Sequence, residues 1–347
     1  MSGILIFGGT GSLGRKLIER LLPITDRIGV VSRDEAKHWT IKNELSAGPL
    51  AEKLPNLHFF VGDIRDKERV KQVIRRFQPY TIIIAAALKQ VDTCELSPSE
   101  AVLTNLVGTQ NVVDAVCDLL SSMPISEVLF VSTDKACAPV NVYGMCKAVS
   151  ERIVTSQAIA VNPSTKFLAV RYGNVLESRG SIIPLFKHQG EKGEFLTVTD
   201  PEMTRYVMTL DDSVDLIMRT VREGKSGETW IPRLPSMKIG HLADIFAKRY
   251  NKPVKIIGLR PGEKRDEDLI NESESVRLRR FTEDEKYYVL GPAFEPGKHS
   301  AFVYSSDHQV MNREELEDHL AKLGILDRPL ADFKGLAIEE IVTNRKD

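Results

Sequence analysis

The chain has 347 residues, enough for one large α/β domain or two domains of ordinary size. Its 47 basic residues nearly balance 48 acidic ones, which argues against a polybasic nucleic-acid binder and against an acidic disordered tail. A hydrophobic share of 42% and a charged share of 27% are typical of a soluble globular protein, and the longest apolar run, residues 82–88, is too short to cross a bilayer.

The first half of the chain alternates short apolar segments with amphipathic ones. Continuous apolar runs predict buried strands at 4–7, 28–31, 57–61, 81–86, 128–131 and 167–170. Between them, apolar residues at helical spacing predict helices around 17–22, 70–77 and 102–120. Repeated strand–helix–strand units predict an α/β fold with a Rossmann-type, doubly wound parallel sheet and right-handed crossovers.

The second half is less regular and predicts a smaller unit interleaved with the first. Residues 173–204 are rich in Gly, Ser and polar side chains. Later signals predict a strand at 229–231, a loop at 258–262 and a helix at 312–323. We predict a Rossmann domain of residues 1–172 with a returning segment at about 206–232, and a C-terminal substrate-binding part of residues 173–205 and 233–347.

Cysteine and histidine residues show no spacing that favours a metal site. The four cysteines form no CxxC pair, and the seven histidines form no HExxH or similar pattern. No basic region with an apolar stretch and a cleavage site precedes the first strand, so nothing suggests export. We therefore expect reduced thiols, no metal and a cytoplasmic protein, with Cys137 and Cys146 as small buried hydrophobes.

A glycine-rich turn follows the first predicted strand and precedes the first predicted helix. Gly8, Gly11 and Gly14 fit the pattern GxxGxxG, and an overlapping GxGxxG register begins at Gly9. A sharp strand-to-helix turn needs residues without Cβ, and it presents backbone N–H groups to a pyrophosphate. This placement predicts a dinucleotide site rather than a purely structural turn. The predicted cofactor contacts in the turn are Gly8, Thr10, Gly11, Ser12, Leu13 and Gly14.

The end of the second predicted strand bears on the choice between NAD and NADP. An acidic residue there suits the ribose hydroxyls of NAD, whereas arginine suits the 2′-phosphate of NADP. This chain has Ser32 and Arg33, which offer a hydroxyl and a cationic fork, followed by Asp34. We favour NADP as the cofactor and predict Lys37 as a further contact. NAD stays possible because Asp34 is acidic and because these residues could instead form a solvated charged turn.

A tyrosine and a lysine four residues apart follow the fifth predicted strand. On a helix, Tyr143 and Lys147 share one face. A free phenol has a pKa of about 10 and is a poor base near neutrality, but a neighbouring ammonium lowers that pKa. Tyr143 is therefore predicted to accept a proton from a sugar alcohol while hydride leaves for the nicotinamide.

With these motifs in place, the chain resembles the extended short-chain dehydrogenase/reductase superfamily. Within it, the chain is most similar to the inverting UDP-N-acetylglucosamine 4,6-dehydratases of the polysaccharide biosynthesis protein family. The resemblance covers most of the chain, and its most specific blocks are STDKA from Ser132, RYGN from Arg171 and RPGEK from Arg260. It also runs through the blocks GGTGSLG, SRDE, GDIRD, AAALKQV, TNLVGTQNV, NVYGMCK and TDPEMTRY.

The resemblance implies a hydro-lyase reaction that recycles NADP. Tyr143 would take the C4 hydroxyl proton as the C4 hydride leaves, Lys135 would remove the C5 proton, and Asp134, held protonated, would help expel the C6 hydroxyl as water. Hydride would then return to C6, and C5 would be reprotonated from the opposite face. Retaining relatives carry Asp-Glu at the Asp134-Lys135 positions, so the lysine favours inversion. Burial of an unpaired lysine would free its base form, whereas a surface salt bridge is the alternative interpretation.

Further site residues come from matching positions in the same blocks. The chain departs from the family pattern at Glu177 and after RPGEK, where the family runs on into Leu-His-Glu and this chain reads Arg265-Asp266-Glu267 near the presumed substrate side. The implied cofactor contacts are Asp63, Ile64, Ala85, Lys89, Tyr143 and Lys147. The implied substrate contacts are Lys89, Asn174, Arg179, Arg205, Arg260 and Glu263, although each arginine is also compatible with a surface position. The implied partners are a UDP-sugar and further copies of the chain, with no nucleic acid and no membrane.

Three functions are compatible with these observations. The first is the dehydratase, a lyase for surface polysaccharide or glycan biosynthesis. The second is an NAD(P)-dependent nucleotide-sugar epimerase or reductase on the same fold, which Asp134-Lys135 disfavours because epimerisation needs no acid for water loss. The third is a non-catalytic nucleotide-sensing module, which the Tyr143 and Lys147 pair disfavours.

Overall fold

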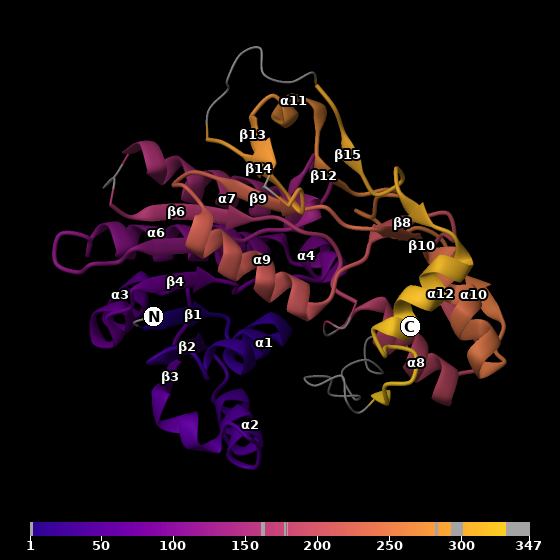
Figure 1. The fold of residues 1–347 in the computed structure, drawn as a ribbon, viewed down its shortest axis with the longest axis horizontal. Helices are drawn as coiled ribbons and strands as arrows, with labels where there is room; N and C mark the ends of the chain where they lie inside the picture. The colour runs from indigo at the N-terminus through magenta and orange to yellow at the C-terminus, as the bar shows by residue number, and fades with distance from the viewer. Residues whose placement is uncertain are drawn as a thin grey trace.

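A nine-stranded sheet is the main feature of the computed structural model, which describes residues 3–160, 164–176, 178, 180–281, 284–292 and 301–330. Its order is β13-β14-β9-β6-β5-β4-β1-β2-β3 (Figure 1). The strands from β9 to β3 are parallel, which confirms the predicted Rossmann-type α/β fold. They are β1 (Ile4–Phe7), β2 (Ile28–Ser32), β3 (Leu57–Val61), β4 (Thr81–Ile84), β5 (Glu127–Val131), β6 (Lys166–Val170) and β9 (Thr229–Pro232).

Helices cover both faces of this sheet because its strands are apolar on both sides. Along β1, Ile4 and Ile6 belong to one core layer, whereas Leu5 and Phe7 belong to the other. The first layer is covered by α1 (Ser12–Leu21), α2 (Glu35–Ser46) and α9 (Leu210–Glu223). The second is covered by α3 (Lys67–Phe77), α6 (Gly108–Cys117) and α7 (Val142–Ala160). None of the helices within the described residues is long and apolar enough to cross a membrane.

The helix predicted at 102–120 begins with a π-helical turn (Val102–Val107) and continues as α6, which ends at Cys117. The short helix α5 (Pro98–Ala101) comes directly before it. The wider turn brings Asn105 to the loop after β4, where its side chain accepts from the Leu88 N–H at 2.8 Å and donates to the Leu88 carbonyl at 2.9 Å. Such turns occur often at functional sites, and this one fixes a loop that borders the cleft described below.

The C-terminal part has its own core, enclosed by α8 (Ile182–Lys192), α10 (Ile239–Tyr250) and α12 (Arg313–Lys322). These helices lie together at the far end of the molecule from β3 (Figure 1). The late helix is as predicted, whereas α8 lies in the stretch that we expected to be irregular. The small sheets of this part are β8 (Thr204–Tyr206) with β10 (Ser236–Lys238) and β16 (Val310–Met311), β7 (Leu196–Val198) with β11 (Val254–Ile256), and β12 (Asp268–Ile270) with β15 (Tyr304–Ser305).

The two parts are joined more tightly than the predicted boundaries imply. β13 (Leu278–Phe281) and β14 (Tyr287–Leu290), from the predicted substrate-binding part, extend the main sheet in antiparallel fashion next to β9. Arg171, buried just after β6, forms ion pairs with Glu151 of α7 and with Glu274 of α11 (Glu272–Ser275). Because a buried cation needs partners, these contacts fix the second part against the first.

Candidate active site

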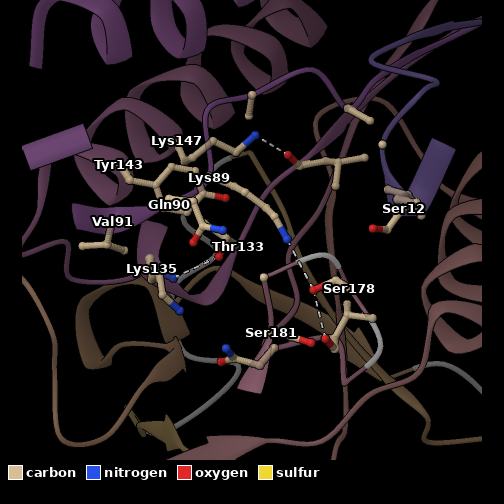
Figure 2. A pocket seen from close by; sticks show the side chains of 18 of the residues that line it. Ser12, Lys89, Gln90, Val91, Thr133, Lys135, Tyr143, Lys147, Ser178 and Ser181 are labelled. Carbon is tan, nitrogen blue, oxygen red and sulfur yellow. Dashed lines mark hydrogen bonds between the residues drawn. The ribbon is translucent and has the colours of Figure 1, made fainter. Parts of the chain in front are cut away.

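One cleft opens where the central parallel strands end, between the Rossmann sheet and the C-terminal part. Its volume is about 690 Å³, and folds of this kind hold their ligands at this edge of the sheet. All the predicted catalytic, cofactor and substrate residues line it except Arg179, which lies outside the described residues. Figure 2 shows side chains from the glycine turn, from the start of α7 and from the loop near Ser178 converging on this space.

The glycine turn has the geometry of a phosphate-binding site. Gly8 has a φ of +86°, and a Cβ there would lie 2.6 Å from the backbone nitrogen of Ala86. A Cβ on Gly14 would lie 2.4 Å from the backbone of Gly9, so packing within the turn requires both glycines. A Cβ on Gly11 would meet no atom closer than 3.6 Å, so the chain leaves space there at the start of α1. A helix N-terminus with open space before it suits a pyrophosphate.

The end of β2 brings a hydroxyl, two cations and two carboxylates together at the cleft. Asp34, the residue that left NAD open, accepts from the Lys37 N–H at 3.1 Å and pairs with Lys37 Nζ at 3.0 Å. These hydrogen bonds from Lys37 lower the pKa of Asp34 and occupy its carboxylate. Ser32 lies 2.7 Å from His38 Nε2, and the exposed Arg33 side chain lines the cleft. The Arg33 guanidinium also lies 3.7 Å from Asp63 Oδ2, so this edge of the cleft carries groups of both charges.

The predicted pair on α7 is present, but Lys147 is not the cation that acts on the phenol. Its Nζ donates to the Val131 carbonyl at 2.5 Å and lies 3.9 Å from the centre of the Phe130 ring. Burial lowers the pKa of Lys147 to about 7. Burial also raises the pKa of Tyr143 to about 12, and the charge that opposes this effect is that of Lys135. The expected lowering of the phenol pKa by Lys147 is therefore wrong for this structure.

Asp134 and Lys135 lie on a 3-10 turn, η3 (Asp134–Ala136), directly after β5. Lys135 is not the unpaired lysine that we expected, because its Nζ is 3.1 Å from Asp134 Oδ1 and 3.3 Å from Glu267 Oε1. Burial alone would lower the pKa of Lys135, but attraction to the two carboxylates raises it above its ordinary value. The sequence showed no spacing that signals Glu267, although the family pattern Leu-His-Glu after RPGEK places a glutamate at this position.

The predicted substrate residues that the structure describes line the cleft from both parts of the chain. Lys89 Nζ donates to Ser178 Oγ at 3.4 Å, and Asn174 is exposed. Glu263 closes a short turn by accepting from the Arg260 N–H at 3.2 Å. Arg205 is buried and donates to the carbonyls of residues 204, 264 and 265, so in this structure it supports the 264–265 loop. Its predicted contact with a diphosphate stays a prediction.

The cysteines have structural positions. Cys94, Cys137 and Cys146 are buried, Cys117 is partly buried, and all four are free thiols, which confirms the expected packing role of Cys137 and Cys146. Within the described ranges, no cluster of three or more His, Cys, Asp or Glu side chains is arranged to hold a metal ion.

Comparisons with known proteins agree with this architecture. A UDP-N-acetylglucosamine 4,6-dehydratase (inverting) from Campylobacter jejuni is 39% identical, and the alignment covers 84% of this chain and 83% of that protein. A UDP-glucose 4-epimerase from Rickettsia conorii is 37% identical, with 92% of this chain and 91% of that protein covered. The X-ray structure of Pen from Bacillus thuringiensis superposes with a TM-score of 0.84 at 32% identity, covering 93% of this chain and 98% of that one.

The family comparison covers the whole Rossmann sheet and most of the cleft. Residues 4–290 match the family described as polysaccharide biosynthesis protein. The matched range contains the glycine turn, η3, the Tyr143–Lys147 pair and Glu267. Together with the fold, this match shows that the chain belongs to the polysaccharide biosynthesis protein family, within the extended short-chain dehydrogenase/reductase superfamily.

Proposed function

We propose that the protein is a nucleotide-sugar 4,6-dehydratase, acting on UDP-N-acetylglucosamine with inversion at C5. The observation that carries this proposal is the Asp134–Lys135 pair, which lines the same cleft as Tyr143 and the glycine turn. Oxidation at C4 needs only a base for the alcohol, whereas loss of water across C5 and C6 also needs a base and an acid. The pair supplies both groups, and the Campylobacter jejuni relative carries the name of this activity.

NADP is the proposed cofactor, held with its pyrophosphate at the Gly11 end of α1 and its 2′-phosphate near Ser32 and Arg33. The open space at Gly11 and the engaged Asp34 carboxylate support this choice. When bound, NADP supplies a hydride acceptor for C4 and afterwards a hydride donor for C6. The enzyme class that follows is a hydro-lyase in which the cofactor is regenerated within each turnover.

Three residues of the chain carry out the proton transfers, one each. Tyr143 takes the proton of the C4 hydroxyl, helped by the positive charge of Lys135, which lowers the phenol pKa against the effect of burial. The C4 ketone acidifies the C5 proton, and Lys135 removes it. Asp134, whose Oδ2 is buried without a partner among the described residues, delivers a proton to the departing C6 hydroxyl.

We also propose that the substrate is held between the two parts of the chain. Residues 1–172 and 206–232 would bind the cofactor, and the remaining segments would bind the UDP-sugar through Lys89 from the first part and Asn174, Arg260 and Glu263 from the second. All four of these residues line the cleft, which supports the assignment. A guanidinium at 260 suits the oxygens of a diphosphate because it donates two parallel hydrogen bonds.

A homo-oligomer is the proposed assembly. The π-helical turn and α7 pack against each other, and both expose apolar side chains: Leu103 and Val107 from the turn, and Met145 and Val149 from α7. Apolar side chains gathered on adjacent helices are typical of an interface between subunits. Light scattering on the purified protein measures the mass of the particle, and a monomer at micromolar concentration contradicts this assignment.

An epimerase is the second candidate, because the Rickettsia conorii relative is named UDP-glucose 4-epimerase. One incubation separates the two activities: the protein is mixed with UDP-N-acetylglucosamine and NADP in deuterated water. Dehydration gives a product lighter by one water, with solvent deuterium at C5 and no net reduction of the cofactor. An altered sugar of unchanged mass without C5 deuterium would instead establish epimerisation.

A further inference from the structure

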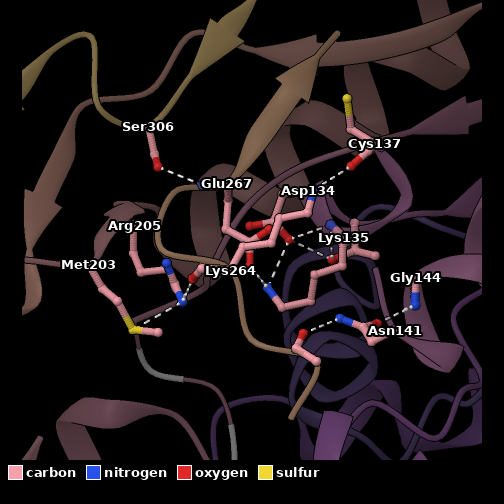
Figure 3. A network of polar contacts seen from close by, with 12 residues as sticks. Asp134, Lys135, Cys137, Asn141, Gly144, Met203, Arg205, Lys264, Glu267 and Ser306 are labelled. Atoms are coloured by element: carbon pink, nitrogen blue, oxygen red, sulfur yellow. Dashed lines mark hydrogen bonds and ion pairs between the residues drawn. The ribbon is translucent and has the colours of Figure 1, made fainter. Parts of the chain in front are cut away.

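Lys135 lies between two buried carboxyl groups that come from different parts of the fold. One is Asp134, its neighbour on η3, and the other is Glu267, in the loop before β12 (Figure 3). The two carboxyl side chains are 1% and 3% exposed. Asp134 Oδ2 and Glu267 Oε2 have no hydrogen-bond partner in the described part of the chain. Since buried polar atoms are usually paired, unpartnered carboxyl oxygens in a cleft indicate groups that exchange protons.

The charged groups around Glu267 leave Lys135 as its direct partner. Asp134 and Lys135 face it from η3, Arg205 from β8 and Lys264 from its own loop. Arg205 is engaged with backbone carbonyls, and Lys264 Nζ donates to the carbonyl that follows η3 at 3.0 Å. Of the cations that the structure describes, Lys135 is therefore the one at ion-pair distance from Glu267. Burial raises the pKa of Glu267, and the attraction of Lys135 opposes that effect.

The backbone of Glu267 is fixed, so this contact does not depend on a flexible loop. Its N–H donates to Ser306 Oγ at 2.9 Å, and its carbonyl accepts from the Ser306 N–H at 2.9 Å. Ser306 Oγ in turn lies 2.6 Å from Thr204 Oγ1, and both hydroxyls are buried. Two hydrogen bonds to one residue hold Glu267 in register beside η3.

The proposed elimination needs a lysine that gives up a proton before it takes one. Asp134 and Glu267 stabilise the ammonium form of Lys135, which cannot act as a base. Asp134 has to carry its own proton for the leaving C6 hydroxyl. Glu267 is the group that remains to accept the ammonium proton, because it contacts Nζ through Oε1 and has a second oxygen without a partner among the described residues.

We propose that Glu267 is a positioning residue that converts Lys135 into a base by accepting its ammonium proton; this inference rests on the proposed dehydratase function. One N–H bond of Lys135 breaks as an O–H bond forms on Glu267. The freed electron pair of Nζ then takes the C5 proton, and the electron pair of the C5–H bond stays on the substrate as the enolate of its C4 ketone. The net charge of lysine, glutamate and sugar is unchanged by the two transfers.

The test compares three variants in the full-length protein loaded with NADP. Glu267→Gln keeps an oxygen for Nζ but accepts no proton, and Glu267→Asp restores a proton acceptor. Asp266→Asn is the matched control, because Asp266 accepts from Thr204 at 2.6 Å in the same segment and has no ion pair with Lys135 in the described structure. Each variant is mixed with UDP-N-acetylglucosamine in deuterated water, and cofactor reduction, C5 deuterium, product mass and melting temperature are recorded.

We expect Glu267→Gln to reduce the cofactor but to incorporate C5 deuterium at least about 100-fold more slowly than wild type at neutral pH. Its remaining rate should rise with pH, since Lys135 must then ionise directly. In the wild type the rate should fall as pH drops through the raised pKa of Glu267, because a protonated carboxyl accepts no second proton. Glu267→Asp should recover part of the rate of C5 deuterium incorporation, and Asp266→Asn should keep a rate close to that of the wild type.

Two results would overturn different parts of the argument. Wild-type exchange and water loss with an unchanged rate and pH profile in Glu267→Gln refute the role of Glu267 alone. A loss of the same size at every pH, matched by Asp266→Asn and by a lower melting temperature, also refutes it in favour of a structural role. Absence of water loss in the wild type refutes the proposed function, whatever the variants do.

Discussion

Replacing Lys135 separates its two roles, which are to neutralise buried carboxyls and to act as a base. Lys135→Arg keeps a positive charge between Asp134 and Glu267, but a guanidinium does not lose its proton near neutrality. Lys135→Met removes both the charge and the base while keeping a side chain of similar length. Both variants should therefore lose proton removal, but only Lys135→Met should also lose stability.

The distances set the size of the electrostatic effect. At an effective dielectric constant of about 20, contacts of 3.1 Å and 3.3 Å each correspond to about 5 kcal/mol of attraction when the carboxyl is ionised and before desolvation is counted. Removing one partner of a buried pair typically destabilises a protein by about 3–5 kcal/mol. We expect that loss in Lys135→Met. It should grow as pH rises, because Glu267 loses the cation that opposes the effect of burial on its pKa, and a carboxyl whose pKa is raised in the folded state stabilises that state only while it is protonated.

The assay combines chemical denaturation between pH 5 and 8 with single-turnover kinetics. Lys135→Arg should unfold close to the wild type and should still reduce the cofactor, yet C5 exchange should fall by about 10²–10⁴-fold. Lys135→Met should lose exchange, lose stability at high pH and also oxidise C4 more slowly, since the charge that lowers the pKa of Tyr143 is gone. Normal dehydration by Lys135→Arg would show that Lys135 is not the base.

Three further predictions concern other parts of the molecule. Tyr143→Phe should bind NADP normally but reduce it about 10²–10⁴-fold more slowly on mixing with the nucleotide sugar, as read by nicotinamide absorbance; an unchanged rate would exclude the phenol as the base. Arg33→Ser should lower the affinity for NADP about tenfold, as measured by calorimetric titration, and leave the affinity for NAD unchanged. Equal losses of affinity for both cofactors would argue against a 2′-phosphate contact. Arg171→Met should lower the free energy of unfolding by about 3–5 kcal/mol, because the buried Glu151 and Glu274 lose their shared cation and Glu274 keeps only the longer contact with Arg277 at 3.5 Å. A loss below about 1 kcal/mol would show that the ion pairs do not hold the two parts together.

The central sheet was predictable because parallel strands covered on both faces are apolar throughout. The strands at 4–7 and 57–61 match the structure at both ends, and the strand predicted at 81–86 ends two residues early, where Ala85 and Ala86 turn into the cleft. The elements that were missed follow weaker local rules. The π-helical turn at 102–107 places Asn105 against Leu88. A single polar contact of this kind does not change the spacing of apolar residues, so it could not be predicted from the sequence.

The cleft was predicted only in part. The residues within short motifs were found, whereas contacts between segments far apart in the sequence were missed. The glycine turn, Asp134-Lys135 and Tyr143 lie in short motifs whose spacing carries the chemistry. Glu267 meets Lys135 because β12 and the loop before it pack against η3, so this ion pair is visible in three dimensions alone. The same distance explains the error about an unpaired lysine, because a sequence does not show which charges a buried side chain will meet.

The positions of Tyr143 and Lys135 relative to each other depend on Gly144, a residue without a reactive side chain. A Cβ on Gly144 would lie 2.1 Å from the Lys135 carbonyl, so α7 approaches η3 more closely than any other residue at this position would allow. Asn141 fixes the same junction by accepting from the Gly144 N–H at 2.7 Å and donating to the Gly262 carbonyl at 2.7 Å. The close approach at Gly144 and the side-chain amide of Asn141 therefore fix the positions of the phenol, the amine and the loop at Gly262. An elimination that hands protons between neighbours needs this rigidity, because proton transfer requires donors and acceptors already within hydrogen-bond distance.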